Sequence, residues 1–220
     1  MEFHKNQLRL YAITNRALTC PKTLFEQTKD ALKGGVTMLQ LREKNLDEQA
    51  FIKEAIQMKE LCHRYQVPLI INDNVTVALK SGADGVHVGI QDMPVGKIRK
   101  QAGSHFIIGA TAKTVQQAKQ AEAEGADYIG AGAIFPSPTK KNAIRITKEM
   151  LCEICSCVSI PTIAVGGVNK NNLSYLRGTG ISGIAVVSAI YEASDAAEAA
   201  KSLKEIISMQ INGMAEQSGV

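Results

Sequence analysis

The segment QLREKN, which begins at Gln40, carries the residues whose types and spacing most directly suggest chemistry. It follows a short apolar run. If that run is a β-strand extending to Lys44, then Gln40, Arg42 and Lys44 share one face and Glu43 points away from them. Arg binds phosphate oxygens through paired hydrogen bonds, and Lys adds a point charge. The spacing favours an anion site; a solvated strand end with surface salt bridges is the alternative.

Acidic and amide side chains follow two further apolar runs, at Asn72-Asp73-Asn74 and at Asp92. One of Asp73 and Asn74 is expected to cap a helix that begins near Val75, and a helix cap is also the alternative for Asp92. If the two runs are adjacent strands, Asp73 and Asp92 lie close together, and two carboxylates repel unless a cation lies between them. Hard oxygen ligands of this kind favour Mg²⁺, with water and phosphate oxygens completing its shell.

Hydroxyl groups, glycines and a further lysine follow the later apolar runs. As a lid, the loop after the sixth run would bring hydroxyls and a lysine over a phosphorylated substrate; a mobile surface loop is the alternative. Backbone N–H groups after the seventh and eighth runs suit a second phosphate. We interpret His87 as a structural histidine. The candidates after these later runs are Thr111, Ser137, Thr139, Lys140, Gly167 and Ser188.

Eight β-rich runs that alternate with amphipathic helical patterns must position these residues. Helix-ending glycines recur before the second, fourth, sixth and eighth runs, and Thr114 and Gly125 are expected to start and stop one helix. The pattern predicts a (β/α)8 TIM barrel over residues 1–211 with a tail at 212–220, and a doubly wound open sheet is the alternative. The predicted strands are Leu8–Ile13, Thr37–Leu41, Pro68–Ile71, Gly85–Val88, Phe106–Gly109, Tyr128–Ala131, Thr162–Val165 and Gly183–Val187.

Composition limits the class of protein. The chain of 220 residues is 45% hydrophobic and 21% charged, and its net charge of +4 is spread without basic blocks, which gives little support to nucleic-acid binding. No run is long and apolar enough for a membrane span, and the N-terminal stretch has no signal-peptide core, so we expect a cytoplasmic protein. The five cysteines, three of them at Cys152, Cys155 and Cys157, are interpreted as reduced apolar residues rather than as a metal site.

Taken together, these motifs resemble those of thiamine-phosphate synthases in an order that spans nearly the whole chain. The segments that carry the resemblance are LYAIT from Leu10, QLREK from Gln40, IND from Ile71, DGVHVG from Asp84, FPxxTK from Phe135, VGG from Val165 and VVS from Val186. The resemblance implies that hydroxymethylpyrimidine diphosphate loses pyrophosphate through a pyrimidine carbocation. The nitrogen of hydroxyethylthiazole phosphate then takes the carbon, which gives thiamine phosphate.

The resemblance also implies roles for individual residues. Gln40, Arg42, Lys44 and Asn72 would contact the pyrimidine diphosphate, and Asp73 and Asp92 would hold Mg²⁺. Thr111, where the family usually has Ser, and Lys140 would contact the pyrophosphate. Contacts with the thiazole phosphate would come from Ser137, Thr139, Gly167, Val187 and Ser188. The implied partners are these small molecules, with no nucleic acid or membrane, and homo-oligomerisation stays open.

Besides Thr111, and Ser137 where Thr is usual, the chain departs from the family pattern in three further places. Ile90 stands where the fourth-strand turn usually has Gln, and Lys113 stands where a His is common. The segment after Lys141, NAIRITKEM, lacks a common glycine. The alternatives are a thiazole tautomerase, which shares the barrel but usually lacks the Arg/Lys run and the paired acids, and a non-catalytic phosphate-ligand sensor. A Schiff-base enzyme using Lys140 is less favoured, because a lysine in a lid is poorly desolvated.

Overall fold

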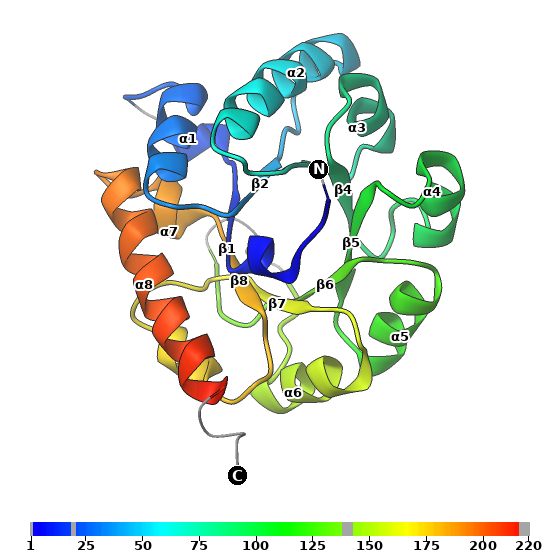
Figure 1. The fold of residues 1–220 in the computed structure, drawn as a ribbon, viewed down its shortest axis with the longest axis vertical. Helices are drawn as coiled ribbons and strands as arrows, with labels where there is room; N and C mark the ends of the chain where they lie inside the picture. The colour runs from blue at the N-terminus through cyan, green and yellow to red at the C-terminus, as the bar shows by residue number, and fades with distance from the viewer. Residues whose placement is uncertain (1, 19–20, 138–142, 216–220) are drawn as a thin grey trace.

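The computed structural model describes residues 2–18, 21–137 and 143–215, with side chains described as far as residue 209. Eight parallel strands form a closed barrel in the order β1 to β8, and β8 pairs with β1 to close it (Figure 1). The helices lie around the outside of this ring. The predicted (β/α)8 barrel is therefore confirmed, and the open-sheet alternative is excluded.

The strands follow the predicted positions with small shifts at their ends. They are β1 (Leu10–Ile13), β2 (Met38–Leu41), β3 (Leu69–Asn72), β4 (Gly85–Val88), β5 (Ile107–Ala112), β6 (Tyr128–Gly132), β7 (Thr162–Val165) and β8 (Gly183–Val186). Two shifts affect the site. Since β2 ends at Leu41, Arg42 and Lys44 lie in the loop after it, and since β5 continues to Ala112, Thr111 lies within a strand.

Helices connect the strands in the expected alternation. They are α1 (Leu24–Lys33), α2 (Glu48–Arg64), α3 (Val75–Ser81), α4 (Val95–Ala102), α5 (Val115–Ala123), α6 (Lys148–Cys157), α7 (Ser188–Tyr191) and α8 (Ala196–Ala215). The short 3-10 helices are η1 (Lys5–Leu8), η2 (Arg16–Leu18) and η4 (Leu173–Leu176). Helix α8 thus continues past residue 211, where the sequence predicts a tail, and residues 216–220 lie outside the described part.

Side-chain caps start two of these helices where the sequence predicts. The Asn74 side chain accepts a hydrogen bond from the backbone of Val77 and so caps α3, and Thr114 does the same for α5 through Gln117. At the other end of α5, Gly125 has φ +94, a conformation that glycine adopts at little cost. The three cysteines of the CxxCxC run lie on α6 and are free thiols.

Two apolar layers hold the barrel together. Alternation along β1 sends Leu10 and Ala12 outward against the helices, and Tyr11 and Ile13 inward. Leu8 of η1 joins the inner cluster, and Phe3 packs against it, so the N-terminal segment covers the bottom of the ring. Figure 1 shows this segment crossing the middle of the barrel. None of the described helices is both long and apolar enough to cross a lipid bilayer.

Candidate active site

One pocket lies at the carboxyl ends of the strands, where barrel chemistry is expected. The structure brings together at its wall nine of the residues proposed from the sequence, namely Gln40, Arg42, Asn72, Asp73, Thr111, Ser137, Gly167, Val187 and Ser188. Lys44 and Asp92 stand beside it through contacts with wall residues. Thr139 and Lys140 lie outside the described residues. What these side chains bind stays a prediction.

The basic side of the pocket follows β2. The backbone N–H of Arg42 donates to the hydroxyl of buried Thr14 over 2.9 Å, which fixes the chain where it leaves the strand. The Lys44 ammonium lies 2.7 Å from a carboxylate oxygen of Asp73. Although the two cations follow the strand and are not part of it, they point toward the same end of the barrel. The arrangement supplies fixed positive charge at the pocket rim.

Glu43 points away from this rim as predicted, although the strand on which that prediction relied ends at Leu41. Its side chain is only 4% exposed, and one of its oxygens lies 3.1 Å from the Arg16 guanidinium. The same guanidinium also contacts Glu54. Burial and, less strongly, the nearby Glu43 charge raise the pKa of the Glu54 carboxyl, while Arg16 acts to lower it. Arg16 therefore holds two carboxylates together behind the loop that carries Arg42.

The predicted acidic pair is also present. Asp73 has φ +61, a left-handed conformation uncommon for a residue with a side chain and typical of functional sites. Burial acts to raise the pKa of Asp73, but hydrogen bonds from Lys44 and other neighbours lower it on balance. The pKa of Asp92 is raised, by burial first and by the adjacent Asp73 carboxylate. The two carboxyl groups thus repel each other in part.

Asp92 does not cap a helix. The residue at the N-cap of α4 is Pro94, and a carboxylate oxygen of Asp92 instead accepts a hydrogen bond from the Gly89 backbone over 2.7 Å. This bond folds the turn after β4 so that Asp92 faces Asp73. The helix-cap alternative for Asp92 is therefore wrong, whereas the corresponding prediction for Asn74 is correct.

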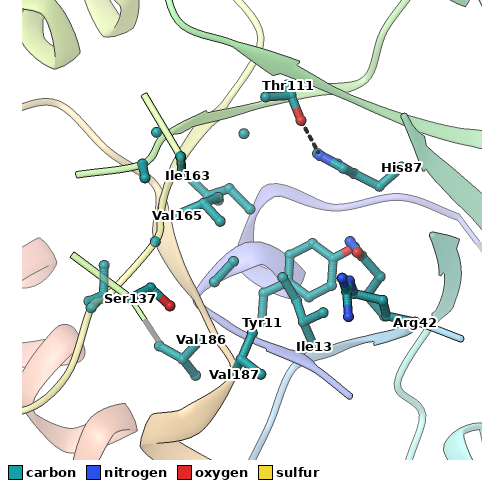
Figure 2. Close-up of a pocket in the computed structure, with 18 of the residues that line it drawn as sticks. Tyr11, Ile13, Arg42, His87, Thr111, Ser137, Ile163, Val165, Val186 and Val187 are labelled. Carbon is teal, nitrogen blue, oxygen red and sulfur yellow. Dashed lines mark hydrogen bonds between the residues drawn. The ribbon is translucent and has the colours of Figure 1, made fainter. Parts of the chain in front are cut away.

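Apolar side chains and glycines form the remaining wall. Ile13, Ile163, Val165 and Val187 line the pocket between its two polar ends, and Figure 2 shows Ser137 and Val187 on the side away from His87 and Thr111. Gly166 and Gly167 follow β7 with φ +96 and +66 and expose their backbone at the wall. A cavity with apolar walls and polar ends suits a ring-shaped ligand that carries an anionic group.

Comparison with known proteins assigns the family. A model of the family described as thiamine monophosphate synthase matches residues 10–190. The chain belongs to the thiamine monophosphate synthase family. It is 46% identical over 184 residues to thiamine-phosphate synthase 2 of Streptococcus pneumoniae, covering 84% of this chain and 88% of that one. It is 46% identical over 178 residues to the thiamine-phosphate synthase of Ruminiclostridium cellulolyticum, covering 81% and 85%.

A solved structure from the same family has the same fold. The thiamine phosphate pyrophosphorylase of Pyrococcus furiosus superposes with a TM-score of 0.86 at 37% identity and covers 94% of this chain and 98% of that chain. A 3-hexulose-6-phosphate synthase superposes with a TM-score of 0.64 at 18% identity, which reflects the barrel alone.

Three polar side chains at the pocket wall escaped the sequence-based assignment. Lys113 lines the pocket and adds a cation there. Tyr11 and His87 line it as well, and His87 Nε2 lies 3.0 Å from Thr111 Oγ1, so the interpretation of His87 as only structural is incomplete. Alternation would have indicated both, because Tyr11 shares a face with Ile13, and His87 shares one with Gly89.

Proposed function

We propose that this chain is a thiamine-phosphate synthase, a transferase that joins hydroxymethylpyrimidine diphosphate to hydroxyethylthiazole phosphate and releases pyrophosphate. The observation that carries the proposal is a single pocket with Arg42 and Asp73 at one part of its wall, and Gly167 and Ser188 at another, with apolar side chains between them. Two phosphorylated substrates require two such polar ends.

Arg42 and Lys44 would bind the diphosphate of the pyrimidine. In the reaction, the bond between the pyrimidine methylene carbon and the diphosphate oxygen breaks, and the electron pair leaves with pyrophosphate. Fixed cations at the position where this negative charge develops lower the barrier, because they need no reorganisation as the bond breaks. The backbone of Arg42 is anchored by the Thr14 hydroxyl, which fixes the point from which its side chain reaches the pocket. The thiazole nitrogen then supplies the electron pair for the new carbon–nitrogen bond.

Asp73 and Asp92 would hold Mg²⁺. The donor set fits this ion, because two adjacent carboxylates supply hard oxygen ligands. Burial first, and then the adjacent Asp73 carboxylate, raise the pKa of Asp92, and a cation would relieve the repulsion between the two carboxylates. Such a shell would be completed by water and by the substrate diphosphate. When bound, Mg²⁺ would act as a Lewis acid toward the diphosphate oxygens. The Lys44 contact with Asp73 would then shift toward the substrate anion.

The other end of the pocket would hold the thiazole phosphate. Gly167, Val187 and Ser188 lie where backbone N–H groups follow β7 and β8, and Ser137 adds a hydroxyl. The apolar wall between the two ends would exclude water from the reactive carbon, which protects a carbocation from hydrolysis. A cytoplasmic enzyme acting on small molecules is the setting that we infer.

The test is a two-substrate assay with the purified chain and Mg²⁺. We expect pyrophosphate and thiamine phosphate to form in equal amounts, and only when both substrates are present. A tautomerase would instead convert the thiazole without any pyrimidine substrate, and a sensor would bind a phosphorylated ligand without turnover. Mass spectrometry of the products, with a coupled pyrophosphate assay, separates the three cases. Absence of thiamine phosphate from a folded protein that binds both substrates would overturn the proposal.

A further inference from the structure

A network of hydrogen-bonded side chains crosses the barrel interior at the floor of the pocket. Gln40 Nε2 donates to Tyr11 Oη over 2.8 Å, and Tyr11 Oη lies 2.9 Å from Tyr128 Oη. Tyr128 Oη lies 3.2 Å from His87 Nδ1, and His87 Nε2 lies 3.0 Å from Thr111 Oγ1. These residues come from β2, β1, β6, β4 and β5 in that order. Gln40 and Thr111, the two ends, both line the pocket.

The packing of the barrel interior leaves room for this network of side chains. The rings of His87 and Tyr128 are stacked, with centroids 5.5 Å apart. Gly109 of β5 and Gly130 of β6 lie against these rings, and a methyl group at either position would come closer to them than real Cβ contacts allow. Small residues at two adjacent interior positions therefore leave the volume that the rings occupy.

The chemistry of the groups gives the network a direction. An amide nitrogen only donates, so Tyr11 Oη accepts from Gln40. Tyr11 and Tyr128 are fully buried, and burial raises the pKa of both phenols, so each keeps its single hydrogen. Either phenol could donate across the 2.9 Å contact, but the direction that continues the Gln40 bond gives the Tyr11 hydrogen to Tyr128 Oη and the Tyr128 hydrogen to His87 Nδ1. In that direction the ring hydrogen of His87 lies on Nε2 and is donated to Thr111 Oγ1.

We propose that this network of hydrogen bonds fixes which groups donate and which accept at the pocket wall. Gln40 Oε1 is then an acceptor, the Thr111 hydroxyl is a donor, and Tyr128 and His87 are positioning residues. The proposal rests on the proposed function for its ligand. An aminopyrimidine offers an N–H donor to Gln40, and an anionic diphosphate oxygen accepts from Thr111. The opposite polarity requires a rotated Gln40 amide, and it would turn the Thr111 hydrogen toward His87.

The first test reads the tautomer of His87 directly and needs no activity. Nitrogen NMR on the full chain labelled with ¹⁵N-histidine distinguishes a protonated ring nitrogen from an unprotonated one. The His87→Asn variant identifies the signal among the four histidines. We expect hydrogen on Nε2 and none on Nδ1. Hydrogen on Nδ1 would mean that the hydrogen bonds run in the opposite donor-to-acceptor direction. That result would overturn the proposal even if the protein is a synthase.

The second test measures function through a double-mutant cycle. Tyr128→Phe interrupts the network, and Thr111→Val removes its terminal hydroxyl without changing its shape. We expect each to lower kcat/KM for the pyrimidine diphosphate about tenfold and the double variant to lose no more than either alone. Thr111→Ser should retain activity. If the fold-losses in kcat/KM of the two single variants multiplied in the double variant, Tyr128 would not act through Thr111.

The control is Tyr191→Phe. Tyr191 is also fully buried and its hydroxyl lies 3.0 Å from Thr28 Oγ1, but it lies on α7 outside the barrel interior. The same atom is removed, so the loss of stability should be similar to that of Tyr128→Phe. We expect the His87 tautomer and kcat/KM to stay unchanged in this variant. If Tyr191→Phe lowered kcat/KM as much as Tyr128→Phe, the effect would be a general one on folding and the proposal would fail. A folded wild type with the Nε2 tautomer but no synthase activity would overturn the proposed function alone.

Discussion

The Lys44 ammonium and the Asp73 carboxylate lie 2.7 Å apart across the ends of two neighbouring strands, β2 and β3. Lys44 is half exposed and Asp73 is one-third exposed, so the pair adds little to stability. Its position at the rim of the pocket gives it a different use, because a diphosphate can replace Asp73 as the partner of the ammonium. The pair keeps the lysine oriented toward the place where the substrate anion would bind.

Replacing Lys44 with Gln should therefore affect catalysis more than folding. We expect kcat/KM for the pyrimidine diphosphate to fall by about 10²-fold, because a cation facing the leaving group is lost. The free energy of unfolding should change by less than about 1 kcal/mol. Steady-state kinetics and urea denaturation measure the two quantities. Lys80→Gln, which breaks the exposed pair with Glu48, is the matched control and should change neither. Equal effects of the two variants would contradict the role of Lys44.

Replacing Asp92 with Asn should raise the stability of the protein even though it removes a proposed metal ligand. The raised pKa of Asp92 reflects its burial and its repulsion by Asp73, so the neutral side chain should increase the free energy of unfolding near pH 7, by less than about 1 kcal/mol at this exposed position. The gain should vanish as the pH falls through the pKa of Asp92, because the wild-type carboxyl is then neutral as well. Urea denaturation at several pH values measures this effect.

The same variant should lose the response to Mg²⁺. We expect Mg²⁺ to raise the Tm of the wild type, most clearly with pyrophosphate present, and to leave the Tm of Asp92→Asn unchanged. Glu153→Gln, which removes one exposed negative charge from α6, should behave as the wild type in both measurements. An unchanged Mg²⁺ response in Asp92→Asn would argue against the metal role of this residue.

Replacing Arg16 with Met should destabilise the region behind the basic rim. Glu43 and Glu54 would then face each other without a cation, and we expect a loss of about 1–3 kcal/mol at neutral pH. The loss should shrink as the pH falls, because Glu54, whose pKa is already raised, takes up a proton first. Denaturation at pH 8 and pH 5 measures the trend. Lys22→Met, which breaks an exposed pair with Asp30, should show a smaller loss.

Replacing two glycines with alanine should change the free energy of unfolding in opposite directions. At Gly109, an Ala methyl would overlap the Tyr128 and His87 rings, and we expect a loss of about 1–3 kcal/mol in the free energy of unfolding. At Gly96, in α4, the methyl would meet Glu124 at ordinary contact distance, so the higher helix propensity of Ala should add about 0.5–1 kcal/mol. Urea denaturation of both variants checks this. A destabilised Gly96→Ala with an unaffected Gly109→Ala would contradict the packing described.

Local patterns in the sequence, together with the family resemblance, were sufficient to predict the barrel and nine of the residues at the pocket wall. Caps such as Asn74 and Thr114 depend on neighbours three residues away, and alternation along a strand places Gln40 inward. The contacts that escaped prediction join distant segments. Tyr11 and Tyr128 are 117 residues apart, and their hydrogen bond depends on how β1 and β6 face each other across the barrel. Nothing local to either tyrosine specifies that relation.

The N-terminal segment has a consequence for how molecules move through the site. Leu8 and Phe3 cover the bottom of the ring, and the rings of Tyr11 and Tyr128 fill the interior above them. Among the described residues, the barrel is therefore closed at the bottom, and the pocket opens at the top. In the proposed reaction, both substrates would enter and both products would leave by this opening. The substrate that binds deeper would have to enter first, and the product that lies deeper would leave last. Order of binding and release is in this way a property of the architecture as well as of the chemistry.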